Sequence, residues 1–146
     1  MNTLLFMGFC IFALFIHNRM REGILNNTTW RALVAAYQTS EDAKTLSGVS
    51  LNIVYYYFNG AYFKRIFRFY KTTEGLLIIP SAQFFIKQRV LIPWSALKPT
   101  KLQQRDMGTM QHLEVADTIL AKIEITRIDF VQYIRPELDK VGNNRN

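Results

Sequence analysis

The segment from Leu51 to Tyr70, LNIVYYYFNGAYFKRIFRFY, carries the strongest fold signal in the chain. Two runs rich in aromatic and β-branched residues, which favour extended strands, flank the dipeptide Asn59-Gly60. This dipeptide favours a two-residue type I′ turn, because both central positions of that turn need a positive φ. The segment therefore predicts a β-hairpin that turns at Asn59-Gly60.

A two-residue turn also fixes which residues of the two strands face each other. The predicted pairs are Phe58 with Ala61, Tyr57 with Tyr62, Tyr55 with Lys64, and Ile53 with Ile66. One face then gathers the better core candidates, which are Val54, Tyr56, Phe58, Phe63, Phe67 and Phe69. The opposite face carries Tyr55, Tyr57, Lys64 and Arg68, and we expect Lys64 to lie against the Tyr55 ring there.

Shorter patterns predict the other elements. Side-chain oxygens at residues 26–29 can cap a helix, and the apolar residues of Trp30–Tyr37 follow the i, i+3, i+4, i+7 spacing of one helix face. Asp129 is the predicted cap of a last helix that ends near Lys140. Residues 84–87 fit either a strand or a helical turn. Further strands are predicted over Leu76–Ile79, Arg89–Trp94, Lys98–Asp106 and Leu120–Arg127.

The predicted fold class is α+β. An N-terminal transmembrane helix precedes a small, mainly antiparallel β domain that has a short N-terminal helix and a C-terminal helix. About six strands joined by tight turns imply hairpins and a meander. The expected division is residues 1–22 for the anchor and its basic flank, 23–141 for the β domain and 142–146 for a disordered tail.

The predicted anchor is the uncharged run Thr3–Ile16, TLLFMGFCIFALFI, which His17, Arg19 and Arg21 follow. With its flanking residues the helix reaches about 27 Å, enough for a slightly thinned bilayer. A cleaved export signal would have a basic residue before the run and small residues at the cut. A buried core helix would keep a polar stripe. We expect a retained transmembrane helix, because neither pattern is evident, and the alternatives are a cleaved export signal and a buried core helix.

The flanking charges predict the orientation of this helix. Cationic side chains favour the cytoplasmic end of a membrane helix, and all those nearby follow the run. Cys10 is the single cysteine, so no internal disulfide can form and nothing indicates an oxidising compartment. We therefore expect a single-pass protein with its N-terminus outside and its domain in the cytoplasm.

A second feature is the placement of charge. The chain has a formal net charge of +7, and residues 64–105 alone hold nine basic residues against the single acid Glu74. These are the candidate lipid- or partner-binding residues: Lys64, Arg65, Arg68, Lys71, Lys87, Arg89, Lys98, Lys101 and Arg105.

Two short motifs suggest a family. Residues 74–79, EGLLII, lead after about a dozen residues to 91–97, LIPWSAL, and an upstream pattern comprises Trp30, Leu33, Ala36 and Tyr37. This combination resembles a family of uncharacterised small bacterial membrane-anchored proteins, and also pleckstrin-homology-like or GRAM-like domains. The resemblance covers residues 30–97. It implies a sheet with a terminal helix and a location in the bacterial inner membrane, and it implies no catalytic residues.

Motifs for catalysis are missing from the sequence. There is no Gly-rich phosphate loop and no nucleophile elbow. Metal-ligating residue types are limited to Cys10, His17 and His112 plus scattered acids, which is unlike a zinc site. His112 and Glu114 share a face if extended, but we interpret His112 as a surface side chain and Trp94 as a core residue. We expect no enzyme, no metal and no cofactor.

The predicted function is therefore a membrane-anchored, non-enzymatic binding or scaffold module. Each Lys or Arg near an anionic membrane contributes about 1 kcal/mol of attraction. The partner is expected to be anionic lipid or an acidic protein. Nucleic acid is not expected, because the hairpin register turns the Phe rings toward the core and away from phosphate. The alternative is an accessory subunit of a larger membrane complex, docked through the anchor helix.

Overall fold

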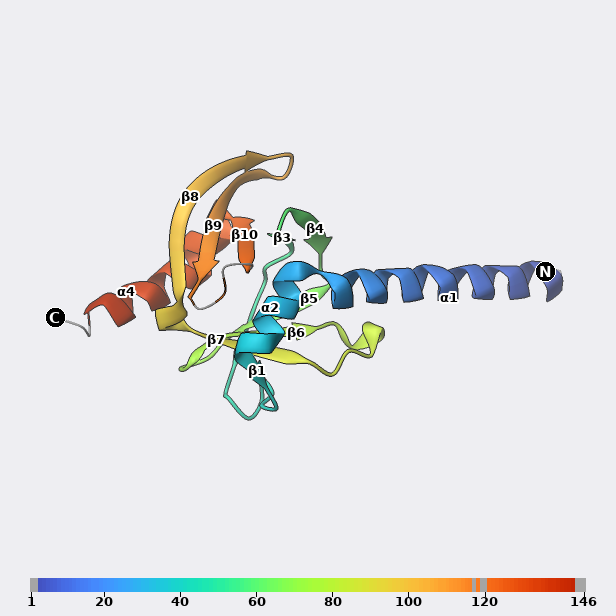
Figure 1. The fold of residues 1–146 in the computed structure, drawn as a ribbon, viewed down its shortest axis with the longest axis horizontal. Helices are drawn as coiled ribbons and strands as arrows, with labels where there is room; N and C mark the ends of the chain where they lie inside the picture. The colour runs from blue at the N-terminus through green and yellow to red at the C-terminus, as the bar shows by residue number, and fades with distance from the viewer. Residues whose placement is uncertain (1–2, 117, 119–120, 144–146) are drawn as a thin grey trace.

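An apolar helix at the N-terminus leads directly into a domain built from two antiparallel sheets, as the computed structural model of the chain shows (Figure 1). The structure describes residues 3–116, 118 and 121–143. The class is α+β, with the long apolar helix, both sheets and a C-terminal helix in the expected order. The coarse architecture predicted from the sequence is therefore confirmed.

Helix α1 spans Thr3–Asn26, 24 residues, and is long and apolar enough to cross a membrane. It continues past the predicted end of the anchor, and Ile24 near its end is 1% exposed within the domain core. Asn27 then caps helix α2, Thr28–Tyr37, by accepting a hydrogen bond from the Trp30 amide at 3.0 Å. The predicted amphipathic helix is confirmed, with Trp30 and Leu33 buried.

The predicted hairpin is confirmed as strands β3, Tyr55–Phe58, and β4, Ala61–Lys64. Both turn residues have positive φ, 51° at Asn59 and 80° at Gly60. The pairs Phe58–Ala61, Tyr57–Tyr62 and Tyr55–Lys64 form as expected, and the Lys64 ammonium lies 5.4 Å from the centre of the Tyr55 ring.

The predicted pair Ile53–Ile66 is wrong. The second strand of the hairpin ends at Lys64, where Arg65 takes a left-handed φ of 55° and turns the chain. The following strand, β5, Phe67–Lys71, lies in the other sheet. The run of residues 61–70 is therefore two strands, and the chain crosses between the sheets at residues 65 and 66.

The first sheet has the order β1-β7-β6-β5-β2 and the second the order β4-β3-β10-β9-β8. The remaining strands are β1 Gln38–Thr39, β2 Val49–Leu51, β6 Gly75–Pro80, β7 Arg89–Pro93, β8 Leu97–Arg105, β9 Gly108–Val115 and β10 Lys122–Thr126. The prediction of a meander is wrong at three places, because β3 pairs with the distant β10, β1 pairs with β7 and β2 pairs with β5. Strands β1, β2 and β9 were not predicted. Leu120, in the predicted last strand, lies outside the described residues.

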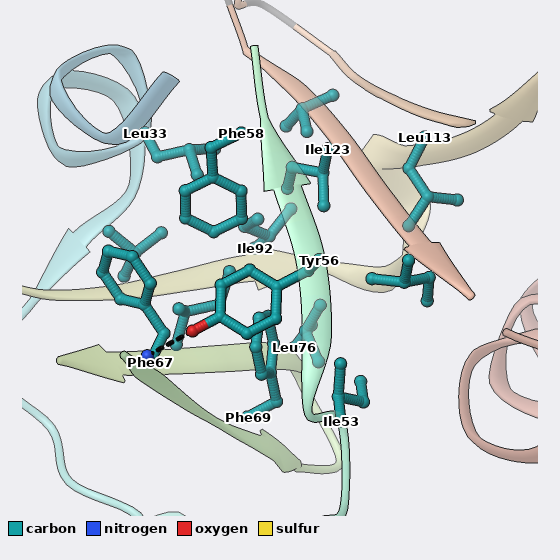
Figure 2. Packing of buried hydrophobic residues seen from close by; sticks show 14 of the residues in the cluster. Leu33, Ile53, Tyr56, Phe58, Phe67, Phe69, Leu76, Ile92, Leu113 and Ile123 are labelled. Atoms are coloured by element: carbon teal, nitrogen blue, oxygen red, sulfur yellow. Dashed lines mark hydrogen bonds between the residues drawn. The ribbon is translucent and has the colours of Figure 1, made fainter. Parts of the chain in front are cut away.

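Aromatic side chains fill the space between the sheets (Figure 2). The rings of Tyr56, Phe58, Phe67 and Phe69 are each no more than 2% exposed and lie within 6.0 Å of a neighbouring ring in the set. The Phe67 amide donates to the Tyr56 hydroxyl at 2.5 Å, and this bond links β3 to β5. Burial raises the pKa of Tyr56 far above its ordinary value, so the hydroxyl stays protonated.

The C-terminal elements close the domain. The 3₁₀ turn η2, Trp94–Ala96, buries Trp94 to 5% exposure as expected, and its indole N–H donates to the Thr72 carbonyl at 3.0 Å. Thr126 caps helix α3, Arg127–Asp129, so the predicted cap at Asp129 is wrong. A π turn, Phe130–Ile134, and helix α4, Arg135–Asn143, follow, so Gly142 and Asn143 are helical. Residues 144–146 of the predicted tail lie outside the described part of the chain.

Replacing Tyr56 with Phe is expected to lower the free energy of unfolding by about 1–3 kcal/mol, because it leaves the buried Phe67 amide without an acceptor. Urea unfolding in detergent, followed by tryptophan fluorescence, measures the change. Tyr55→Phe is the matched control in the same strand, since the Tyr55 ring is only partly buried. Its effect should stay within about 0.5 kcal/mol. Equal losses in both variants would contradict the importance of the Tyr56 bond.

Candidate functional site

The segment between β6 and β7, residues 81–88, forms a loop whose first residue is fixed by two hydrogen bonds. At its base the Ser81 amide donates to the Ile66 carbonyl at 2.8 Å, and the Ser81 hydroxyl donates to the Arg65 carbonyl at 3.0 Å. The loop contains the 3₁₀ turn η1, Ala82–Phe84, which shares only Phe84 with the ambiguous stretch 84–87, and residues 85–87 form neither a strand nor a helix. Phe84 is 1% exposed, whereas Phe85 is 78% exposed and has a left-handed φ of 52°. The backbone thus points one ring inward and the next outward.

His17 connects this loop to the N-terminal helix. Its Nε2 lies 2.5 Å from the Gln83 carbonyl oxygen, and its ring stacks on Phe84 with centroids 5.6 Å apart. The Phe85 ring lies 6.2 Å from the His17 ring, edge to face. In Figure 1 the loop between β6 and β7 extends alongside α1 toward its N-terminal end. The loop tip is therefore level with the first residue after the apolar run.

Three of the nine predicted cations surround a hollow next to this loop, with a volume of about 560 Å³. Arg68 comes from β5, Arg89 from β7, and Lys87 from the loop itself. The apolar part of the wall includes Ile79, Pro80, Phe85 and Ile86. We call Arg68, Lys87, Arg89 and Phe85, with the space they surround, the basic hollow.

The cations of the basic hollow keep their charge available. Among the residues that the structure describes, no carboxylate forms an ion pair with Arg68, Lys87 or Arg89. The Arg89 guanidinium is positioned by donating to the carbonyls of Ser40 and Glu41, at 3.3 Å each. The pKa of Asp42 is lowered chiefly by hydrogen bonds from Thr45, and the attraction of Arg89 is the smallest of the causes. The hollow is therefore suited to an anionic ligand.

The other six predicted cations lie elsewhere and differ in how they are paired. Lys71 forms an ion pair with Glu137 at 3.3 Å, and Arg105 forms one with Glu124 at 3.0 Å. Lys64 lies on the Tyr55 ring, and Arg65 occupies the crossing between the sheets. Lys98 and Lys101 are exposed on β8 of the second sheet. Nearness in the sequence thus did not bring the nine residues to one place.

Glu137 shows how an ion pair engages one of the predicted cations, Lys71. Burial raises the pKa of its carboxyl, but the hydrogen bonds from Lys140 and Lys71 act more strongly together and lower it. Lys71 is therefore engaged in holding α4 against β5, rather than available to a ligand.

A second polar cluster lies on the outer face of the second sheet, where His112 of β9 and Glu124 of β10 are directly paired. His112 is 8% exposed, with Nδ1 3.5 Å from a Glu124 oxygen, so its interpretation as a surface side chain is wrong. Arg105 donates twice to the Glu124 carboxylate, at 3.0 Å each, and this bonding raises the pKa of Arg105. The sequence suggested Glu114 as the neighbour of His112, but the true partner lies across the strand pair.

A further hollow has different chemistry. It has a volume of about 840 Å³ and lies between the β8–β9 turn and α3. Met107, Ile128 and Val131 give it an apolar wall, and the opposite charges of Arg127 and Asp129 leave no excess for an anion. In the described ranges no group of His, Cys, Asp and Glu residues is placed to hold a metal ion.

Comparisons of the chain with models of protein families, with curated proteins and with solved structures give no match. The candidate site therefore depends on its geometry alone. Sequence reasoning named Arg68, Lys87 and Arg89 but missed Phe85 and the contact with His17. The available signal was the Phe84-Phe85 pair, which begins four residues after Pro80 at the end of a strand and is followed by the cations Lys87 and Arg89.

Replacing Glu137 with Gln is expected to destabilise the fold by about 1 kcal/mol at pH 7, since the ion pairs with Lys71 and Lys140 are lost. Because the folded-state pKa of Glu137 is lowered, its stabilisation is present above the ordinary carboxyl pKa and disappears as the pH falls through the lowered value. Urea unfolding at several pH values should show the variant and the wild type converging in acid. Asp139→Asn, at an exposed 3.9 Å pair, is the control and should change little. A gap that persists in acid would contradict this account.

Proposed function

We propose that this protein is a membrane-anchored, non-enzymatic binding module whose basic hollow binds the head groups of anionic lipids. The contact between His17 and the residue 81–88 loop carries the proposal. It places Arg68, Lys87 and Arg89 beside the point where an apolar helix would leave a bilayer.

The strength of the expected attraction supports this function. A Lys or Arg near an anionic surface contributes about 1 kcal/mol, so the three cations of the hollow together contribute about 3 kcal/mol. That is a modest affinity for a free protein. For a domain that is already tethered it is sufficient, because the tether holds the domain within reach of the surface.

Retention of α1 in the membrane is part of the proposal. The helix is fixed to the folded domain at two points, since Ile24 lies in the core and His17 contacts the loop. The cations after the apolar run favour a cytoplasmic domain with the N-terminus outside, in a single-pass protein of the bacterial inner membrane. The resemblance to membrane-anchored pleckstrin-homology-like domains agrees with a binding role.

An accessory subunit of a membrane complex is the second candidate function. Strand β4 lies at the edge of its sheet, and a hollow of about 450 Å³ separates it from Met20, Gly23 and Ile24 of α1. An open strand edge beside a membrane helix is suited to pairing with another chain. Extraction in mild detergent distinguishes this candidate, because a subunit would migrate with its complex and a binding module as a single chain.

Anionic lipid is expected to protect the loop in the full-length protein. In nanodiscs, the amides of residues 81–89 should exchange hydrogen more slowly when phosphatidylglycerol is present than in phosphatidylcholine alone. The double variant Arg68→Gln and Lys87→Gln should weaken this lipid dependence by about 2 kcal/mol, roughly thirtyfold. High salt should weaken it as well, since screening at 1 M acts within about 3 Å.

The matched control is Lys98→Gln with Lys101→Gln, which removes the same charge from exposed positions of β8. This control should keep the full response to phosphatidylglycerol. Equal protection of the residue 81–89 amides in both lipids would contradict the lipid proposal. An acidic protein would then be the partner to test. If both double variants lost the lipid-dependent protection equally, the effect would come from the overall charge of the domain and not from the basic hollow.

A further inference from the structure

We infer that the loop of residues 81–88 is a second membrane contact, which inserts Phe85 into the bilayer because the apolar run of α1 is too short to span it alone. The inference depends on the proposed membrane location of α1. It does not depend on recognition of anionic lipid, and it makes the bilayer itself the partner of the loop.

The length of the apolar run is the first step. Thr3–Ile16 comprises 14 residues, about 21 Å of helix, against a hydrocarbon thickness of about 30 Å. The difference is about 9 Å, or six helical residues. A short span is accommodated when flanking residues are drawn toward the bilayer or when the bilayer thins. Here the flanking residue His17 is bound to the loop, so drawing it inward also draws in Gln83 and Phe85.

The side chain that would enter the lipid is the second step. Phe85 is 78% exposed, which with Ile128 at 77% is the highest value among the large apolar residues of the described part of the domain. Its left-handed φ is unfavourable for a bulky residue, so the fold keeps this ring outside at a cost in free energy. Strain of this kind collects at functional positions, and an exposed aromatic ring is stabilised at the membrane interface.

The surroundings of Phe85 are the third step. Lys87 and Arg68 line the same hollow and can reach phosphate groups while the ring lies deeper. An apolar side chain flanked by cations is the composition of segments that lie in the interface, with apolar groups about 5–10 Å deep. In Figure 1 this loop reaches farther along α1 than the other loops that consist of described residues. The bilayer therefore meets this loop first.

The test places a fluorophore in the full-length protein by Phe85→Trp. The native Trp30 and Trp94 are 1% and 5% exposed in the core, so their emission is a constant background. In phosphatidylcholine nanodiscs the emission of the new tryptophan should shift to the blue, and lipids brominated on their acyl chains should quench it. Ile128→Trp is the matched control, because Ile128 is 77% exposed but lies on α3, next to the β8–β9 turn and not next to the loop of residues 81–88. The control should be quenched severalfold less.

Bilayer thickness tests the cause of insertion. Quenching of the tryptophan at position 85 should rise with the length of the acyl chains. Inserting seven leucines after Leu14 adds about 10 Å of apolar helix and nearly two full turns, so the helix face is kept. This longer span should abolish most of the quenching. A nitroxide on Phe85→Cys, with the native thiol removed by Cys10→Ser, gives the same depth by an independent measurement.

Equal quenching at positions 85 and 128 would overturn the inference. Quenching at position 85 that ignores both acyl-chain length and the leucine insertion would overturn its cause. Neither result depends on phosphatidylglycerol, so failure here is distinguishable from failure of the head-group proposal. A third outcome is protection of the loop by phosphatidylglycerol without quenching of the tryptophan at position 85. This outcome would support electrostatic binding at the membrane surface and contradict insertion of the ring.

Discussion

The bond between the Tyr56 hydroxyl and the Phe67 amide lies where the chain crosses from one sheet to the other, and the remaining geometry follows from it. It determines where β5 begins, and therefore where Arg68 lies. The crossing residues Arg65 and Ile66 also offer their carbonyls to Ser81, which fixes the base of the loop. A break at this point would displace the loop and one of its cations together.

The sequence predicted the elements whose causes are local. Asn59-Gly60 determines its own turn, and the Asn27 cap determines the start of α2. It could not predict the pairing of β3 with β10, because the two strands are separated by more than sixty residues and only the common core brings them together. Strand β9 was missed because two of its polar residues, Gln111 and His112, are buried by the strand pairing, whereas their local pattern is typical of exposed positions.

The candidate site was predictable to a similar degree. Counting charges along residues 64–105 identified the right residue types, but it could not show that Lys71 and Arg105 are held by the distant acids Glu137 and Glu124. Those acids are placed by α4 and β10, which the charge pattern does not describe. Phe85 was missed for the opposite reason, since an apolar residue gives no local sign that the fold will leave it outside.

Only Asn27 separates α1 from α2, and it hydrogen-bonds backwards to Ile24 and sideways to the Phe58 carbonyl. Such a joint has little freedom to swivel. If α1 lies in a bilayer as proposed, a rotation of α1, for example by contact with a neighbouring helix, would rotate the whole domain with it. The orientation of the two sheets relative to the membrane would then depend on the rotation and tilt of α1.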